Sequence, residues 1–241
     1  ASSGALGLVG HGLGGSFSWT SIPGTVCSDL RRLLCLEPGA SAASPAEWQP
    51  GALTFVTSVE GLGELESWPQ AGGQAGLAAG DTICRNLATA AHLPAPQSFV
   101  AWLSDATADA VDALTSNGPF RRLDGFAIAG SKAALVGGPV LNSIHIDENF
   151  VYIQRLGSTW TGTGADGLHT GTDCAFWSSS HPAVDGTAGL ATFSRDAAWS
   201  AAYGYSCESP GSLYCFSNVV TLFWDGFDYT GDTGRWSSAV P

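Results

Sequence analysis

The chain has 241 residues and carries nine Lys and Arg against 21 Asp and Glu, which gives a net charge of −12. Because binding through phosphates requires basic side chains, and Lys132 is the only lysine, we expect no nucleic-acid partner. The uncharged runs 1–28 and 86–104 are interrupted by Pro and other residues that do not suit a membrane span, so we expect no insertion into a membrane. Hydrophobic residues reach 44% with nine Trp, so the composition favours a folded core over disorder. The sequence contains no Met, which indicates a removed leader or a piece cut from a longer protein.

In chain order, the first segment is residues 1–38, which resemble a later part of the same chain. A Trp and two Cys recur at spacings of eight residues with an offset of 180: Trp19, Cys27 and Cys35, then Trp199, Cys207 and Cys215. The motif Gly-x-x-Gly-Leu precedes each Trp, at 4–8 and at 186–190. We therefore expect 1–38 to be the C-terminal part of a repeat whose full copy follows a small-residue linker, 39–51.

The full copy, 52–217, opens with a strand predicted over 53–58 by its β-branched and aromatic residues. Asp81 is the expected N-cap of a helix, and apolar residues at helical spacing place Cys84 on its buried face. A second strand is predicted over 98–104 and a second helix over 108–114, ended by Asn117-Gly118. Short strands and Gly-rich loops follow, so we expect an α+β fold, with a strand and turn in the tail 218–241.

The six cysteines are expected to form disulfides. They allow fifteen complete pairings, and none of them forms the C-x-x-C spacing of a zinc ribbon or a thioredoxin-like motif. An even number in a chain of this composition is typical of an oxidising compartment. We therefore expect a secreted, extracellular or cell-surface protein.

Short motifs across 52–217 resemble a bacterial endostatin-like family, as in leptospiral endostatin-like surface proteins. In the first half they are Gly80-Asp81-x-x-Cys84-x-x-x-Ala88 and Ala101-Trp102-Leu103-Ser104, and in the second half Trp160-Thr-Gly162, Cys174-x-x-Trp177 and Leu213-Tyr214-Cys215. The resemblance implies a C-type-lectin-like fold with two helices, long loops and nested disulfides, Cys84–Cys215 and Cys174–Cys207. It does not transfer a ligand, because the basic heparin-binding surface of endostatin has no counterpart in a chain with one lysine.

Two interpretations of residues 1–38 remain open. In the first, Cys27 and Cys35 pair with each other and the segment lies along its own full domain. In the second, the segment inserts into another subunit as an added strand or bonds to it covalently, which would build a chain of subunits.

Three Trp residues in loops or tails are candidates for contact with a ligand, although packing between segments is the favoured interpretation: Trp48, Trp68 and Trp236. The Trp residues at the family's core positions are instead expected to be buried: Trp102, Trp160, Trp177 and Trp199. Three carboxylates near the end of the chain are candidate calcium ligands, or else solvated turn residues: Asp225, Asp228 and Asp232. Apart from this calcium, no cofactor is expected.

Two histidine sites lie near carboxylates, and they would support a metal or acid–base role only if their side chains converge. One is His145 with Asp147 and Glu148, and the other is His169 with Asp166 and Asp173. The alternative is that these are polar loop residues.

The function we predict is that of a non-catalytic binding or adhesion module whose partner is a protein or copies of the chain itself, as in a fibre or surface structure. The alternative is a carbohydrate-binding, lectin-like module assisted by calcium. A hydrolase ranks third and would require an Asp/His pair in an open cleft.

Overall fold

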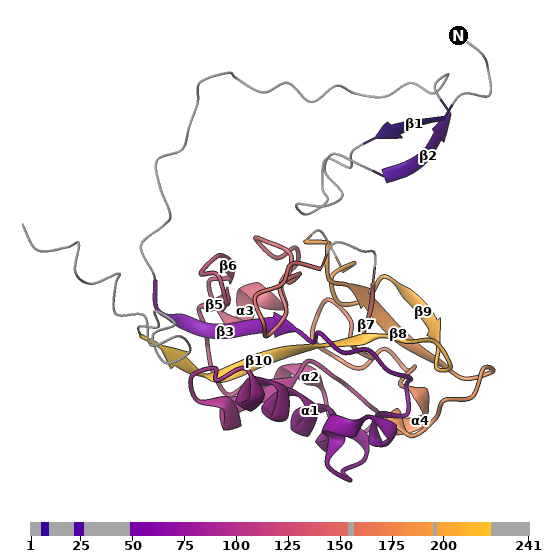
Figure 1. Ribbon diagram of the computed structural model, residues 1–241, viewed down its shortest axis with the longest axis horizontal. Coiled ribbons are helices and arrows are strands. Elements are labelled where there is room, and N and C mark those ends of the chain that lie inside the picture. The colour runs from indigo at the N-terminus through magenta and orange to yellow at the C-terminus, as the bar shows by residue number, and fades with distance from the viewer. Residues whose placement is uncertain (1–5, 10–21, 27–48, 154–156, 195–196, 223–241) are drawn as a thin grey trace, which may run out of the picture.

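The computed structural model describes residues 6–9, 22–26, 49–153, 157–194 and 197–222 (Figure 1). Its strands are β1 (Leu6–Val9), β2 (Ile22–Val26), β3 (Gly51–Val56), β4 (Phe99–Ala101), β5 (Phe120–Arg122), β6 (Ala127–Ala129), β7 (Ser158–Trp160), β8 (Asp185–Leu190), β9 (Tyr203–Ser206) and β10 (Ser212–Thr221). Its helices are α1 (Gly76–Ala90) and three single turns, α2 (Ala110–Ala113), α3 (Lys132–Leu135) and α4 (Cys174–Trp177). Short 3-10 turns cover Leu65–Ser67, Pro69–Ala71 and Pro96–Ser98.

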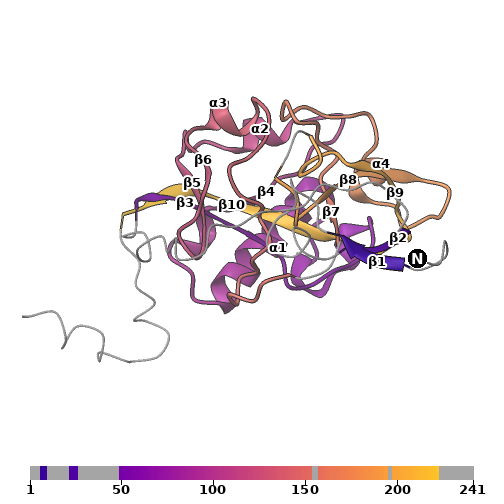
Figure 2. The ribbon, with the colours of Figure 1, turned by 90° about the horizontal axis from the view of Figure 1, so that it is seen from above.

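The expected mixture of α and β structure is confirmed: one eight-stranded sheet, two disulfides and few helices in the described residues. The strand order is β6-β5-β3-β10-β7-β8-β9, and β4 also pairs with β10. Strands β3 and β5 run parallel, as do β7 and β10, whereas the other pairs are antiparallel. Figure 1 shows β3 and β10 side by side through the middle of the body, and Figure 2 shows β5 and β6 at one end with β8 and β9 at the other.

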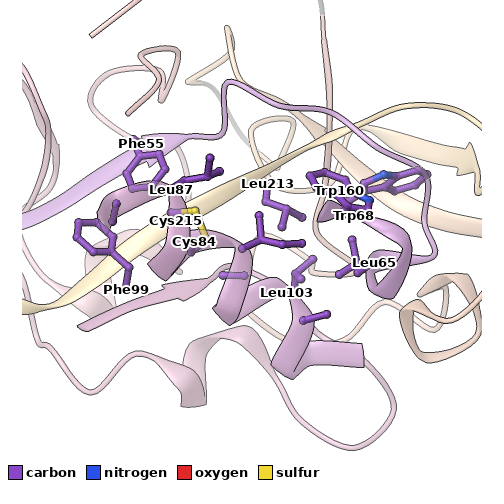
Figure 3. Packing of buried hydrophobic residues seen from close by; sticks show 14 of the residues in the cluster. Phe55, Leu65, Trp68, Cys84, Leu87, Phe99, Leu103, Trp160, Leu213 and Cys215 are labelled. Atoms are coloured by element: carbon purple, nitrogen blue, oxygen red, sulfur yellow. A yellow bond between two sulfur atoms is a disulfide. The ribbon is translucent and has the colours of Figure 1, made fainter. Parts of the chain in front are cut away.

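Both faces of the central strands are buried, because successive side chains of a strand point to opposite faces. On one face, residues of β3 and β10 pack with α1: Leu53, Phe55, Leu213 and Cys215. On the other face, alternate residues of the same strands pack with the aromatic residues Trp102 and Phe120: Ala52, Val56, Tyr214 and Phe216. The sheet is therefore the middle layer between two apolar cores. Figure 3 shows the first of them.

Helix α1 is the one long helix in the described part of the chain, and it begins earlier than expected. The prediction that Asp81 caps it is wrong, because the helix starts at Gly76 and its N-cap is Ala75. The Asp81 carboxylate instead accepts the backbone N–H of Ala101 in β4 at 2.9 Å and pairs with Arg85 at 3.2 Å. Asp81 thus contacts a neighbouring strand instead of capping its own helix.

A disulfide joins α1 to the central strand. Cys84 is fully buried, as its helical spacing predicts, and it is bonded to Cys215 of β10 with a Cα–Cα distance of 5.5 Å. This pairing is one of the two that the family resemblance implies.

The second predicted strand and the second predicted helix are both shorter than expected. The strand over 98–104 is reduced to β4, Phe99–Ala101. The helix over 108–114 is reduced to the single turn α2, which ends at Ala113, well before Asn117-Gly118. Because Ser104 accepts the N–H of Ala110 and Asp105 accepts that of Ala108, local side chains hold this stretch in turns.

The second disulfide anchors an unusual turn, α4. Cys174 is bonded to Cys207, the other pairing that the resemblance implies. All four residues of α4 have positive φ, between 52° and 60°, so the turn is left-handed, a conformation that L-residues with side chains disfavour. The disulfide holds its first residue, and the buried Trp177, whose Nε1 donates to the Ser104 carbonyl at 3.1 Å, holds its last.

The four Trp residues expected in the core, at positions 102, 160, 177 and 199, are fully buried. No helix among the described residues is both long and apolar enough to span a membrane.

Strands β1 and β2 pair antiparallel with each other and form a separate two-stranded sheet. Cys27 and Cys35 lie outside the described residues, as do Trp48, Trp236 and the calcium candidates Asp225, Asp228 and Asp232.

Candidate functional site

A buried arginine organises the end of the sheet formed by β5 and β6. Arg122 is the last residue of β5, and its side chain is only 6% exposed. It pairs with Asp124 in the turn between the two strands, with Nε–Oδ1 and Nη2–Oδ2 distances of 2.9 and 2.5 Å. Its Nη1 donates to the Ser143 carbonyl at 3.1 Å. The guanidinium therefore ties the β5–β6 turn to the loop around Ser143, and the bidentate geometry fixes its plane.

Two aromatic rings flank this guanidinium. The Arg122 Cζ lies 5.0 Å from the centre of the Phe126 ring and 5.7 Å from that of the Tyr152 ring. The Tyr152 hydroxyl donates to Asp124 Oδ2 at 2.8 Å, so the ion pair also orients this ring. Both rings remain open to solvent, since Phe126 is 56% and Tyr152 45% exposed. Cation–π contacts with the buried Arg122 thus hold two solvent-facing aromatic residues in place.

The loop that carries Tyr152 adds two further exposed apolar residues, Phe150 and Val151. Asp147 shapes this loop, because its Oδ1 accepts the N–H groups of Asn149 and Val151 at 2.8 and 2.9 Å. Phe150 has a φ of 64°, which is rare for a bulky residue. We call Arg122, Asp124, Phe126, Phe150, Val151 and Tyr152 together the Arg122 surface.

The carboxylate that follows Asp147 clamps the loop to the body. Glu148 is buried and accepts both the N–H and the hydroxyl of Ser58, just after β3. Burial raises the pKa of Glu148 above its ordinary value, although these hydrogen bonds oppose the shift. The predicted site around His145, Asp147 and Glu148 is thus a scaffold that supports the Arg122 surface.

The buried His145 contacts the Arg122 guanidinium. Its Nδ1 lies 3.0 Å from Arg122 Nη1 and 2.8 Å from Ser143 Oγ. Burial lowers the pKa of His145, and the nearby charge of Arg122 lowers it further. For Asp124, burial raises the pKa, but the hydrogen bond and the charge of Arg122 outweigh it, so the net pKa is lowered. This site therefore favours a neutral imidazole beside an intact ion pair.

Ser143 and His145 have the spacing of a nucleophile and its base. Both side chains are at most 3% exposed, however. The His145 Nδ1 that lies near Ser143 Oγ also lies near Arg122 Nη1.

In the second histidine site, the side chains of His169 and Asp173 lie close together. His169 Nε2 lies 3.2 Å from Asp173 Oδ2, whereas Asp166 accepts the N–H of Leu168 in its own loop. Asp173 also caps α4 by accepting the N–H of Phe176 at 3.1 Å. In the described part of the chain, no three His, Cys, Asp or Glu side chains are grouped closely enough to hold a metal ion.

A cavity of about 320 Å³ lies between α1, β4 and α2. Its wall is aliphatic apart from Asp81, Asp109 and Asp112. Asp109 accepts the N–H of His169 at 2.6 Å, and Asp81 holds β4 as described above. Burial raises the pKa of Asp81 above its ordinary value, although the Ala101 N–H and Arg85 oppose the shift. Two of the three carboxylates thus stabilise the fold.

Of the two interpretations of Trp68, packing and contact with a ligand, the structure shows packing. Its side chain is 4% exposed, belongs to the first core cluster and donates from Nε1 to the Leu62 carbonyl at 2.9 Å. Figure 3 shows it beside Trp160 and Leu65. A stretch that looks like a loop in the sequence folds into two 3-10 turns that bring this ring inward.

No family model matches this chain, and no curated protein sequence matches it either.

The residues of the Arg122 surface, unlike those of its scaffold, are not predicted from the sequence. Arg122 and Tyr152 are 30 positions apart, and only the fold brings them together. The one local signal is the run Phe150-Val151-Tyr152 directly after polar residues that favour a turn.

Proposed function

We propose that this chain is a secreted or cell-surface, non-catalytic binding module that engages a protein partner through the Arg122 surface. The two disulfides support an oxidising compartment. The nested disulfide pairing and the long loops after α1 support an endostatin-like domain with a C-type-lectin-like fold. Function must still be argued from the site itself, since such folds carry many functions.

The observation that carries the proposal is a pair of aromatic rings, Phe126 and Tyr152, held against Arg122 while open to solvent, with the exposed Phe150 and Val151 next to Tyr152 in the chain. Phe126, Phe150, Val151 and Tyr152 are each between 44% and 58% exposed. Exposed apolar clusters of this kind mark interaction sites, and aromatic residues are enriched where binding energy concentrates. Contacts with Arg122 and Asp124 already restrict the Phe126 and Tyr152 rings, so less side-chain entropy is lost when a partner binds.

The chemistry of the surface favours a protein over a sugar. The polar atoms of Arg122 and Asp124 already bond to each other, to Ser143 and to Tyr152. A sugar ring needs polar partners for its hydroxyls in addition to an aromatic face. An apolar protein face needs only the rings and aliphatic groups that this surface presents.

The test uses the double variant Phe126→Ser/Tyr152→Ser. Tyr203→Ser on β9 is the matched control, because Tyr203 is 42% exposed, close to the 45% of Tyr152, and lies at the other end of the sheet. Each protein is measured for self-association by sedimentation equilibrium and for binding to arrays of immobilised extracellular proteins and of glycans.

We expect saturable protein binding or self-association that the double variant loses and the control keeps. A glycan signal that depends on the same two rings would overturn the protein assignment in favour of the lectin alternative. Binding that the double variant retains in full would show that the Arg122 surface is not the site.

A further inference from the structure

The contact between Arg122 and His145 defines the protonation state of the imidazole. Arg122 Nη1 carries two N–H groups, and two acceptors lie within reach of it: the Ser143 carbonyl at 3.1 Å and His145 Nδ1 at 3.0 Å. Because a guanidinium can only donate, His145 Nδ1 must accept. A ring nitrogen that accepts carries no proton, so the hydrogen-bond pattern requires a neutral imidazole with its hydrogen on Nε2.

A proton on Nδ1 is incompatible with this contact. The N–H of an imidazolium would point at the N–H of Arg122, and two positive charges would meet with their nitrogen atoms 3.0 Å apart. The Ser143 carbonyl, 3.1 Å from Nδ1, already accepts from Arg122. Both cationic side chains are buried, so water screens their repulsion little. One of them must therefore move when His145 binds a proton.

The ionisable groups that other segments place near the imidazole do not remove this conflict. Asp124, from the turn between β5 and β6, favours the imidazolium, but its carboxylate already binds the Arg122 guanidinium and the Tyr152 hydroxyl. Although burial raises the pKa of Asp124, the hydrogen bond and charge of Arg122 lower it overall, so this carboxylate stays ionised while His145 titrates. The Tyr152 ring lies against the imidazole, with 5.5 Å between the ring centres, so a shift of the imidazole also affects this ring.

The two carboxylates that follow His145 on its own loop bind other groups. Asp147 accepts two backbone N–H groups of the loop, and Glu148 accepts the N–H and the hydroxyl of Ser58. Burial raises the pKa of Glu148, so this residue also binds a proton as the pH falls. Its titration must be separated from that of His145 by experiment.

We propose that the Arg122 surface is acid-sensitive: protonation of His145 separates the imidazole from the Arg122 guanidinium and frees the two aromatic rings that this guanidinium holds. These rings are Phe126 and Tyr152. A partner that binds the ordered rings is then released in acid. By linkage, each unit by which the partner lowers the pKa of His145 corresponds to about tenfold weaker binding in acid. The release of a partner rests on the function proposed above, whereas the change in the rings does not.

The test compares the full chain with two variants by NMR, from about pH 7.5 to about pH 5. In His145→Asn, the amide oxygen takes the place of Nδ1 and accepts from Arg122 but does not titrate. Glu148→Gln is the control for the neighbouring carboxylate. Imidazole nitrogen shifts report the tautomer and the protonation of His145, and nuclear Overhauser contacts between Arg122 and the Tyr152 ring report the order of the surface.

We expect the Nε2–H tautomer at neutral pH and loss of the Arg122–Tyr152 contacts with the same midpoint, below pH 6.5, as the titration of His145. His145→Asn should keep these contacts over the whole range, and Glu148→Gln should lose them as the unmodified chain does. The proposal is overturned by an Nδ1–H tautomer at neutral pH, by an imidazole that stays neutral until the protein unfolds, by contacts that survive its protonation, or by an equal loss of contacts in His145→Asn.

The array measurement of the previous section, repeated at the acid end of this range, separates the two proposals. Binding that depends on the two rings but is equally strong for the unmodified chain and His145→Asn in acid would overturn the release of the partner and leave the binding function standing. Rings that are freed in acid, without any binding that depends on them at neutral pH, would overturn the binding function and leave the acid-sensitive contact standing.

Discussion

Removing the disulfide between α1 and β10 should destabilise the protein more than removing the one at the left-handed turn. The Cys84–Cys215 bond closes a sequence separation of 131 residues and Cys174–Cys207 one of 33. Loop-closure entropy gives about 5 kcal/mol for the longer loop and about 4 kcal/mol for the shorter. All four sulfurs are fully buried, so the loss of packing is similar for both pairs.

The left-handed turn widens this difference. Loss of the bond at Cys174 frees a stretch whose residues each lie about 1–2 kcal/mol above the right-handed form, so part of the loss is recovered when the turn relaxes. We therefore expect the double Ala variant of the outer pair to lose about 5 kcal/mol of unfolding free energy and that of the inner pair at least about 1 kcal/mol less. Typical domains have about 5–15 kcal/mol in total, so the outer variant should be close to unfolding.

The measurement is equilibrium unfolding in guanidinium chloride at 25 °C, followed by the fluorescence of the buried Trp residues. Cys27 and Cys35 are replaced by Ala in every sample to prevent disulfide exchange. Equal losses, or a larger loss for the inner pair, would refute loop closure as the source of the stabilisation.

Three further predictions concern stability. Acidification below pH 6.5 should reduce the unfolding free energy, by up to about 1.4 kcal/mol per pH unit. The cause is that the pKa of His145 is lowered in the folded state, so the folded protein binds this proton only at a lower pH than the unfolded chain does. The variant His145→Gln should lack this part of the pH dependence. Gly189→Ala should cost at least about 3 kcal/mol through its clash with backbone, whereas Gly204→Ala, with open space around it, should stay within about 0.5 kcal/mol in urea unfolding. Trp68→Ala should cost about 3–5 kcal/mol in the same assay, and a neutral result would restore its assignment to the surface.

The parts of the fold that the sequence predicts well are those set by residues close together in the sequence. Helical spacing placed Cys84 on the buried face, and β-branched content located β3 to within two residues at each end. The sequence does not predict the start of α1 at Gly76, because a glycine at position 80 disfavours a helix there. There, a Cβ would meet Leu103 Cδ1 at 2.4 Å, so close packing against the body explains the glycine.

The candidate site could not be predicted, because distant segments build it. Arg122 comes from a strand, Asp124 from a turn and Tyr152 from a loop, and none of the three belongs to a recognisable motif. For the histidine and carboxylates nearby, the sequence leaves open a chemical role and a role as polar loop residues, and the structure shows them as supports of the loop and of Arg122. A polar cluster in a sequence does not reveal whether it faces a ligand or its own backbone.

Strand β10 is the last strand in the described residues, yet it lies at the centre of the sheet between partners from much earlier in the chain. During synthesis, β3, β4 and β7 therefore leave the ribosome without the strand that joins them. Their hydrogen-bonding edges on the side of β10 stay unpaired until residue 221 has emerged. Such long-range pairing is slow and exposes the chain to aggregation. Efficient production of this protein should depend on chaperones that hold the nascent chain until its final segment is complete.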